Sequence, residues 1–149
     1  MSGLVKTMHL TKHLEPNNVA VKLGAIRRKH LKILIVDDEE RFRRSMCFYL
    51  RRKYEAQVKD VASGQEAVEA LKSGETFDVI FLDLMMPEMS GTQTYAMLKR
   101  IDEHCAIVLM SAHSDKIETT KAELLDVELL SKPIPADVMN RILLDLPHS

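Results

Sequence analysis

The chain has 149 residues, of which 46% are hydrophobic and 29% charged, and its formal net charge is −1. This ordinary globular composition excludes a fibrous, low-complexity or intrinsically disordered chain. No apolar run approaches the roughly 18 residues of a membrane-spanning helix, and no export signal opens the chain. Cys47 and Cys105 do not have the spacing of a disulfide framework or a metal site. We therefore expect a cytoplasmic protein without a membrane partner.

The charge is unevenly distributed along the chain, because residues 1–32 are strongly basic and the remainder is acidic. A basic arm can steer a protein toward an acidic partner or a nucleic acid. However, no Phe, Tyr or Trp accompanies the charge, as stacking on bases would require, so we expect a solvated leader rather than a nucleic-acid site. We therefore predict an N-terminal extension over residues 1–31 and one domain over residues 32–149.

From residue 32 onward, short apolar runs alternate with longer amphipathic stretches. Several runs, such as 33–36, 79–82 and 107–110, are apolar without alternation, which is typical of strands buried on both faces in a parallel sheet. The predicted strands are 32–36, 56–61, 77–82, 106–110 and 127–130.

Amphipathic stretches between and after these strands predict helices over 39–53, 64–72, 92–101, 113–124 and 136–144. Ser63 and Glu66 have the spacing of a capping box, and Pro135 suits the first turn of the last helix. Five strand–helix units predict an α/β fold. We expect an open, doubly wound, five-stranded parallel sheet with helices on both faces.

The first, third, fourth and fifth predicted strands each end at a polar residue. In chain order these residues are Asp37 and Asp38, Asp83, Ser111 and Lys132. Because ligands bind outside the carboxyl ends of strands in doubly wound sheets, we expect these side chains to share one crevice. Taken singly, each has an ordinary explanation, such as a helix cap or a solvated lysine. Their joint position at successive strand ends is what indicates a functional site.

The residue types in this crevice indicate phosphoryl transfer. Three clustered carboxylates repel one another and take up protons unless a cation lies among them, and oxygen ligands suit Mg²⁺. Lys132 supplies a positive charge for an anion, and the hydroxyl of Ser111 can donate to a phosphoryl oxygen. An aspartate in such a setting can form an aspartyl phosphate.

The strand ends also carry a family resemblance. The segments ILIVDDE, VIFLDLMMPEMSG, MSA and SKP occupy residues 33–39, 79–91, 110–112 and 131–133. In this order they resemble a response regulator receiver domain of two-component signalling, over about residues 32–146. The resemblance implies a flavodoxin-like fold with strand order 2-1-3-4-5. Since the chain as given ends shortly after the last predicted helix, we expect a stand-alone receiver with an N-terminal extension.

The resemblance implies a signalling phosphoacceptor that catalyses only its own phosphorylation and dephosphorylation. Asp83 would accept a phosphoryl group from a sensor histidine kinase or a phosphotransfer protein, and the domain would then act on a downstream protein that the sequence does not name. Four protein ligands are implied for Mg²⁺: Asp37, Asp38, Asp83 and the backbone carbonyl of Met85.

The resemblance also assigns roles around this centre. Lys132 and Ser111 would contact the phosphoryl group. Pro133 follows the lysine as in the family pattern, in which the peptide bond between the two is often cis. Met85 and His113, two residues beyond Asp83 and Ser111, would influence the lifetime of the phosphate.

Two features depart from the family pattern. Leu129 occupies the switch position that usually holds Tyr or Phe, three residues before the lysine. The segment 112–132 is about one residue short and lacks the usual Gly-containing turn, so the fourth helix is expected to be displaced, short or mobile.

Three alternatives stay open at this point. One is a receiver-like binding module that acts without phosphate, motivated by Leu129. A second is a haloacid-dehalogenase-like phosphohydrolase, although Met85 stands where that chemistry needs a second acid. The third is salt-dependent nucleic-acid binding by residues 1–31.

Overall fold

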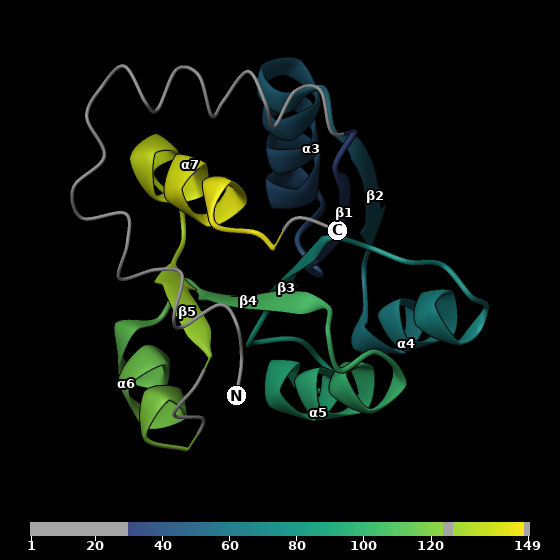
Figure 1. Cartoon of the computed structure of the whole chain (residues 1–149). Coiled ribbons are helices and arrows are strands. Elements are labelled where there is room, and N and C mark those ends of the chain that lie inside the picture. Colours follow the sequence, from purple (N-terminus) through teal and green to yellow (C-terminus); the bar gives the residue numbers. More distant parts are fainter. Residues whose placement is uncertain (1–29, 124–126, 148–149) are drawn as a thin grey trace.

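The computed structural model describes residues 30–123 and 127–147, which form one α/β unit around a single sheet (Figure 1). The strands are β1 (Lys32–Val36), β2 (Gln57–Val61), β3 (Val79–Asp83), β4 (Ala106–Ser111) and β5 (Glu128–Ser131). The helices are α3 (Glu40–Tyr54), α4 (Gly64–Lys72), α5 (Gly91–Ile101), α6 (Ser114–Glu123) and α7 (Ala136–Leu144). The strands run parallel in the order β2-β1-β3-β4-β5, which confirms the predicted fold.

The sheet is covered on both faces, by α3 and α7 on one side and by α4, α5 and α6 on the other (Figure 1). Each face has its own apolar core. In β1, Ile33 and Ile35 pack into the core beneath α3 and α7, while Leu34 and Val36 pack into the opposite core. This two-sided burial explains why the central strands are apolar at every position instead of alternating with polar residues.

Strand and helix boundaries differ from the predicted ones by at most two residues. The hydrogen bonding at the helix starts also differs from the prediction. Ser63 accepts a hydrogen bond from the N–H of Glu66 as predicted, but the Glu66 carboxylate accepts from the N–H of Ala62, so the predicted reciprocal capping box is wrong. A complete capping box occurs instead at Ser90 and Gln93, which the sequence analysis did not identify.

The last helix begins at Ala136 as predicted, but Pro135 is its N-cap and is not part of its first turn. The preceding helix, α6, begins one residue later than predicted, at Ser114. The predicted last residue of that helix, 124, and residues 1–29 of the predicted extension over 1–31 lie outside the described residues.

Gly91 determines how closely α5 approaches the end of β3. A Cβ at this position would lie 2.4 Å from the carbonyl oxygen of Asp83 and 2.5 Å from the Cα of Leu84. The Gly91 N–H also donates to the carbonyl of Leu84, at 3.0 Å. Only glycine permits such a close approach of two backbone segments, so Gly91 holds the first turn of α5 directly beside the carboxyl end of β3.

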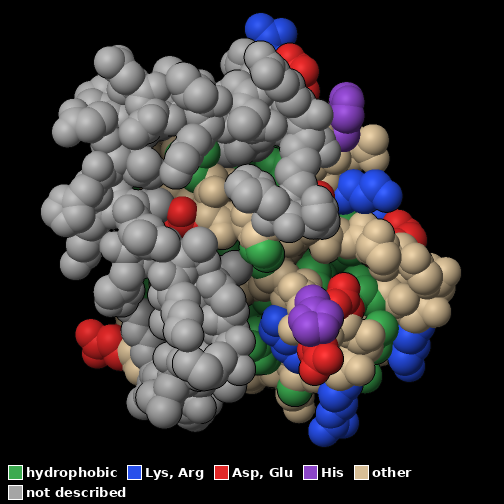
Figure 2. Space-filling model, in the orientation of Figure 1, with side chains coloured by type: hydrophobic (Ala, Val, Ile, Leu, Met, Phe, Trp, Pro, Cys, Tyr) green, Lys and Arg blue, Asp and Glu red, His purple; other side chains and the backbone are tan. Residues whose placement is uncertain are grey.

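On the described part of the surface, acidic and basic side chains are interspersed rather than separated into large single-sign areas in the view of Figure 2. Among the described helices, none is long and apolar enough to cross a lipid bilayer.

Candidate functional site

Three aspartates meet at the carboxyl edge of the sheet. Asp37 and Asp38 follow β1, and Asp83 is the last residue of the neighbouring strand β3. One carboxylate oxygen from each of the three lies within 4.8 Å of the others. Asp37 and Asp83 are buried, whereas Asp38 is exposed. The predicted convergence of these residues is therefore present, with one side of the cluster open to solvent.

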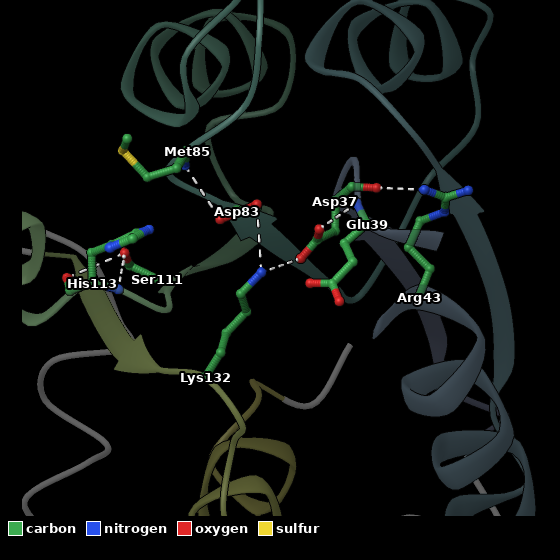
Figure 3. Close-up of polar contacts among 8 residues, drawn as sticks. All are labelled: Asp37, Glu39, Arg43, Asp83, Met85, Ser111, His113 and Lys132. Atoms are coloured by element: carbon green, nitrogen blue, oxygen red, sulfur yellow. Dashed lines mark hydrogen bonds and ion pairs between the residues drawn. The ribbon is translucent and has the colours of Figure 1, made fainter. Parts of the chain in front are cut away.

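Lys132 reaches the same cluster from the segment after β5 (Figure 3). Its Nζ lies 2.7 Å from Oδ2 of Asp37 and 3.5 Å from Oδ2 of Asp83, and only 9% of the side chain is exposed. The backbone of Lys132 is held by its N–H, which donates to the carbonyl of Ser111 at 2.8 Å. The bond from Lys132 to Pro133 is cis, as the resemblance implied.

Backbone N–H groups orient both buried carboxylates. The Glu39 N–H donates to Oδ1 of Asp37 at 2.9 Å, and the Met85 N–H donates to Oδ1 of Asp83 at 3.2 Å (Figure 3). These contacts direct the Oδ2 atom of each carboxylate toward Lys132. They arise from the local turns after β1 and β3.

Two residues in the first turns of α3 also support the site and were not assigned to it by the sequence analysis. Nη1 of Arg43 donates to the carbonyl of Asp37 at 2.7 Å, and its Nε lies 3.0 Å from Oδ2 of Asp60. The ring of Phe42 lies under Nζ of Lys132, with 4.5 Å between the nitrogen and the ring centroid. Helical periodicity places these residues on α3 but does not show that α3 lies against the segment after β5.

The ionisation of the cluster follows from burial and charge. Burial, together with the neighbouring Asp37 carboxylate, raises the pKa of Asp83 to about 6, while Lys132 and the Met85 N–H oppose the shift. Burial alone would lower the pKa of Lys132, but the hydrogen bond to Asp37 and the charges of Asp83 and Asp37 raise it overall. A lysine kept charged between two buried carboxylates is the expected result.

The donor set fits a hard divalent cation. It offers carboxylate oxygens only, and the exposed Asp38 leaves room for water or phosphate oxygens, which Mg²⁺ retains when bound. A cation there would also relieve the repulsion that raises the pKa of Asp83. Met85, whose carbonyl the resemblance implies as a fourth ligand, adjoins the cluster through its N–H and has a side chain that is 46% exposed.

The remaining predicted residues lie on the β4–β5 side of the site. Ser111 is buried at the end of β4, and its hydroxyl accepts from the His113 N–H at 3.0 Å and donates to the His113 carbonyl at 3.3 Å. His113 itself is exposed. Leu129 is buried in the core beneath α4, α5 and α6. Since β3 lies between β1 and β4, Ser111 flanks Asp83 on the side away from Asp37 (Figure 3).

Comparisons with known proteins agree with this arrangement. A family model described as "Response regulator receiver domain" matches residues 33–143. The transcriptional regulatory protein SrrA of Staphylococcus aureus is 38% identical over 92 residues, which cover 62% of this chain and 36% of SrrA, so the match spans about a third of that relative.

Solved structures give a consistent result. The response regulator TrrA of Thermotoga maritima, solved in complex with Mg²⁺ and BeF, is 25% identical with a TM-score of 0.68, and the match covers 78% of this chain and 99% of TrrA. A receiver protein of Sinorhizobium medicae is 28% identical with a TM-score of 0.67, over 79% of this chain and 97% of that protein.

Proposed function

The chain belongs to the response regulator receiver domain family of two-component systems, and from this premise we propose that it takes a phosphoryl group onto Asp83 in the presence of Mg²⁺. The observation that carries the proposal is the cluster of Asp37, Asp38 and Asp83 within 4.8 Å, with Lys132 bridging its two buried members. This arrangement combines an acceptor, a cation site and a fixed positive charge in one place.

Asp83 is the proposed acceptor because its Oδ2 faces Lys132 while its Oδ1 is held by the Met85 N–H. With a pKa near 6, its carboxylate is largely ionised at neutral pH. One of its oxygens would attack phosphorus. The new O–P bond forms as the P–N bond of a donor phosphohistidine breaks, and the imidazole nitrogen leaves with the electron pair.

The other residues would stabilise the transferred charge. The three aspartates, with the Met85 carbonyl as the fourth proposed ligand, would hold Mg²⁺, which would supply positive charge to the phosphoryl oxygens. Lys132 would add its own charge by shifting from Asp37 toward the phosphoryl group. Ser111 would turn its hydroxyl from the His113 carbonyl to a phosphoryl oxygen, and Met85 and His113 would limit the access of water.

The proposed partners are a sensor histidine kinase or phosphotransfer protein and a downstream protein that recognises the phosphorylated state. We do not propose turnover of free phosphate esters, because the exposed side chain of Met85 stands where a phosphohydrolase would need an acid. Both cysteines are free, as expected in a reducing compartment, and we propose that the exchange takes place in the cytoplasm.

The test is labelling of the full chain with acetyl phosphate, followed by mass spectrometry. The acyl phosphate forms on Asp83 as the phosphoryl bond to acetate breaks. Labelling is expected only with Mg²⁺, and Asp83→Asn should abolish it. Asp78→Asn, which changes an aspartate at the opposite end of β3, serves as the control and should leave labelling intact. Label that persists in EDTA or in Asp83→Asn contradicts the proposal.

A second candidate function, a binding module that acts without phosphate, is favoured by Leu129, whose aliphatic side chain is packed into the core where the family usually places an aromatic ring. Amide hydrogen exchange separates the two. If the switch operates, Mg²⁺ with beryllofluoride should change protection in β5 and α6. Changes confined to residues contacting the added ions would favour the binding module.

A further inference from the structure

Phe42 gives Lys132 a third partner besides the two carboxylates. Nζ of Lys132 lies 4.5 Å from the centroid of the Phe42 ring, within the range of a cation–π interaction. Asp37 and Asp83 lie 2.7 and 3.5 Å from the same nitrogen. The ammonium is therefore held between an aromatic face and the two buried carboxylates, and because it is largely shielded from water the attraction of the ring is strengthened.

The ring differs from the carboxylates in one important respect. Each carboxylate is a directional hydrogen-bond acceptor, whereas the ring face attracts a cation over a broad area. An ammonium that leaves Asp37 for a phosphoryl group on Asp83 would lose its shortest contact, the one at 2.7 Å, but it could slide across the ring without leaving it. An aliphatic residue at this position would provide packing without attraction.

We propose that Phe42 is a positioning residue for Lys132. Its ring would keep the Lys132 ammonium beside the aspartate cluster while the ammonium leaves Asp37 and binds the incoming phosphoryl group. This inference rests on the proposed function, since it assigns Lys132 a movement during phosphorylation. The Phe42 ring carries no hydrogen-bond donor or charge for the phosphoryl group, so its proposed effect acts through Lys132.

A purely structural role for Phe42 is the competing explanation, because the ring is partly buried and packs against the core beneath α3 and α7. That role depends on size and shape. The positioning role depends on the negative charge density of the ring face, which fluorination lowers with little change in volume. A series of mono-, di- and trifluorophenylalanine at position 42 therefore separates the two roles.

The first measurement is the rate constant for Mg²⁺-dependent labelling of Asp83 by acetyl phosphate. It should fall progressively along the fluorinated series, reaching about a tenfold loss for trifluorophenylalanine and for Phe42→Leu, and stay within about twofold for Phe42→Tyr. The affinity for Mg²⁺ alone should stay within about twofold throughout. The same substitutions at Phe48, a 69% exposed ring on the same helix, are the matched control and should leave the rate unchanged.

The second measurement needs no metal or phosphate. In the metal-free full chain, NMR of the Lys132 ε-methylene protons should show an upfield ring-current shift, assigned with Lys132→Arg and lost in Phe42→Leu. Absence of that shift overturns the inference.

The outcomes also separate this inference from the function on which it rests. A flat rate along the fluorinated series, with normal labelling of the wild-type chain, overturns the positioning role and leaves the phosphoacceptor function standing. A wild-type chain that takes no label removes the function and the inference together.

Discussion

The two sides of the site are built in different ways. On the β1–β3 side, Lys132 forms ion pairs with both Asp37 and Asp83. On the β4–β5 side, the Ser111 hydroxyl is bonded to the backbone of His113, and Leu129 is buried in an apolar core. The β1–β3 side is sensitive to bound ions, since any cation or anion changes the electrostatic balance between its carboxylates and Lys132. The second can respond only by exchanging local hydrogen bonds and repacking, so the two sides should be separable by mutation.

The largest expected effect is that of Lys132→Met, which removes the cation from between two buried carboxylates. Breaking a buried ion pair typically lowers the free energy of unfolding by about 3–5 kcal/mol, and we expect a loss of that order in EDTA. Mg²⁺ should restore much of it, because the cation replaces the lost charge. The measurement is urea unfolding with and without Mg²⁺.

Lys59→Met is the matched control for that experiment. Lys59 forms an exposed ion pair with Glu75, for which a loss below about 1 kcal/mol is expected. Two outcomes would show that the β1–β3 side is not organised as described. One is an equal loss of stability in the two variants. The other is that Mg²⁺ stabilises Lys132→Met no more than it stabilises the wild type.

A smaller effect, dependent on pH, is expected for Asp83→Asn. The pKa of Asp83 is raised to about 6 in the folded chain, so above pH 6 folding must bury a charged carboxylate. As the pH falls from about 6 toward the usual aspartate value near 4, the folded chain takes up the proton and the penalty disappears. In EDTA, Asp83→Asn should therefore be more stable than the wild type by on the order of 2 kcal/mol at pH 7.5, with little difference near pH 4.

The check is urea unfolding of both proteins across that pH range. A stability difference that stays constant with pH, or that grows toward acid, contradicts the assignment of this penalty to the Asp83 carboxylate. Asp115→Asn, which changes an exposed aspartate on α6, should show no such profile.

The smallest effect is expected for Ser111→Ala, on the uncharged side. Losing the bond from the His113 N–H to the Ser111 hydroxyl should lower stability by about 1 kcal/mol. The affinity for Mg²⁺ should stay within about twofold of the wild type, whereas Asp38→Asn, on the charged side, should weaken it clearly. Isothermal titration with MgCl₂ in the absence of any phosphodonor measures both, and a comparable loss in the two variants would mean that the sides are coupled.

The sequence was informative where a short pattern has one physical solution. Apolar runs such as 33–36 and 79–82 can be satisfied only by burial on both faces, which led to the parallel sheet and from there to the meeting of Asp37, Asp83 and Lys132. The roles assigned to these residues remain predictions until phosphorylation is measured.

What the sequence did not reveal depends on contacts between distant elements. The position of Phe42 under Lys132 requires α3 to lie beside the segment after β5, and the contacts of Arg43 require β2 to lie beside α3. Helical periodicity shows which residues share a face but not what that face meets. The reciprocal cap at Ser90 and Gln93 is different, because it is a local motif whose three-residue spacing can be read from the sequence alone.

The contact of Gly91 with the end of β3 has a consequence for comparing related sequences. The missing side chain lets the backbone of α5 rest on the backbone of Asp83 and Leu84. A relative that keeps the three aspartates and the lysine but has a larger residue at this position must route its chain differently after the third strand. The carboxylate of its third aspartate would then have different backbone surroundings, however well the acidic residues align. Position 91 therefore helps to decide whether an aligned aspartate can be assumed to have the same surroundings.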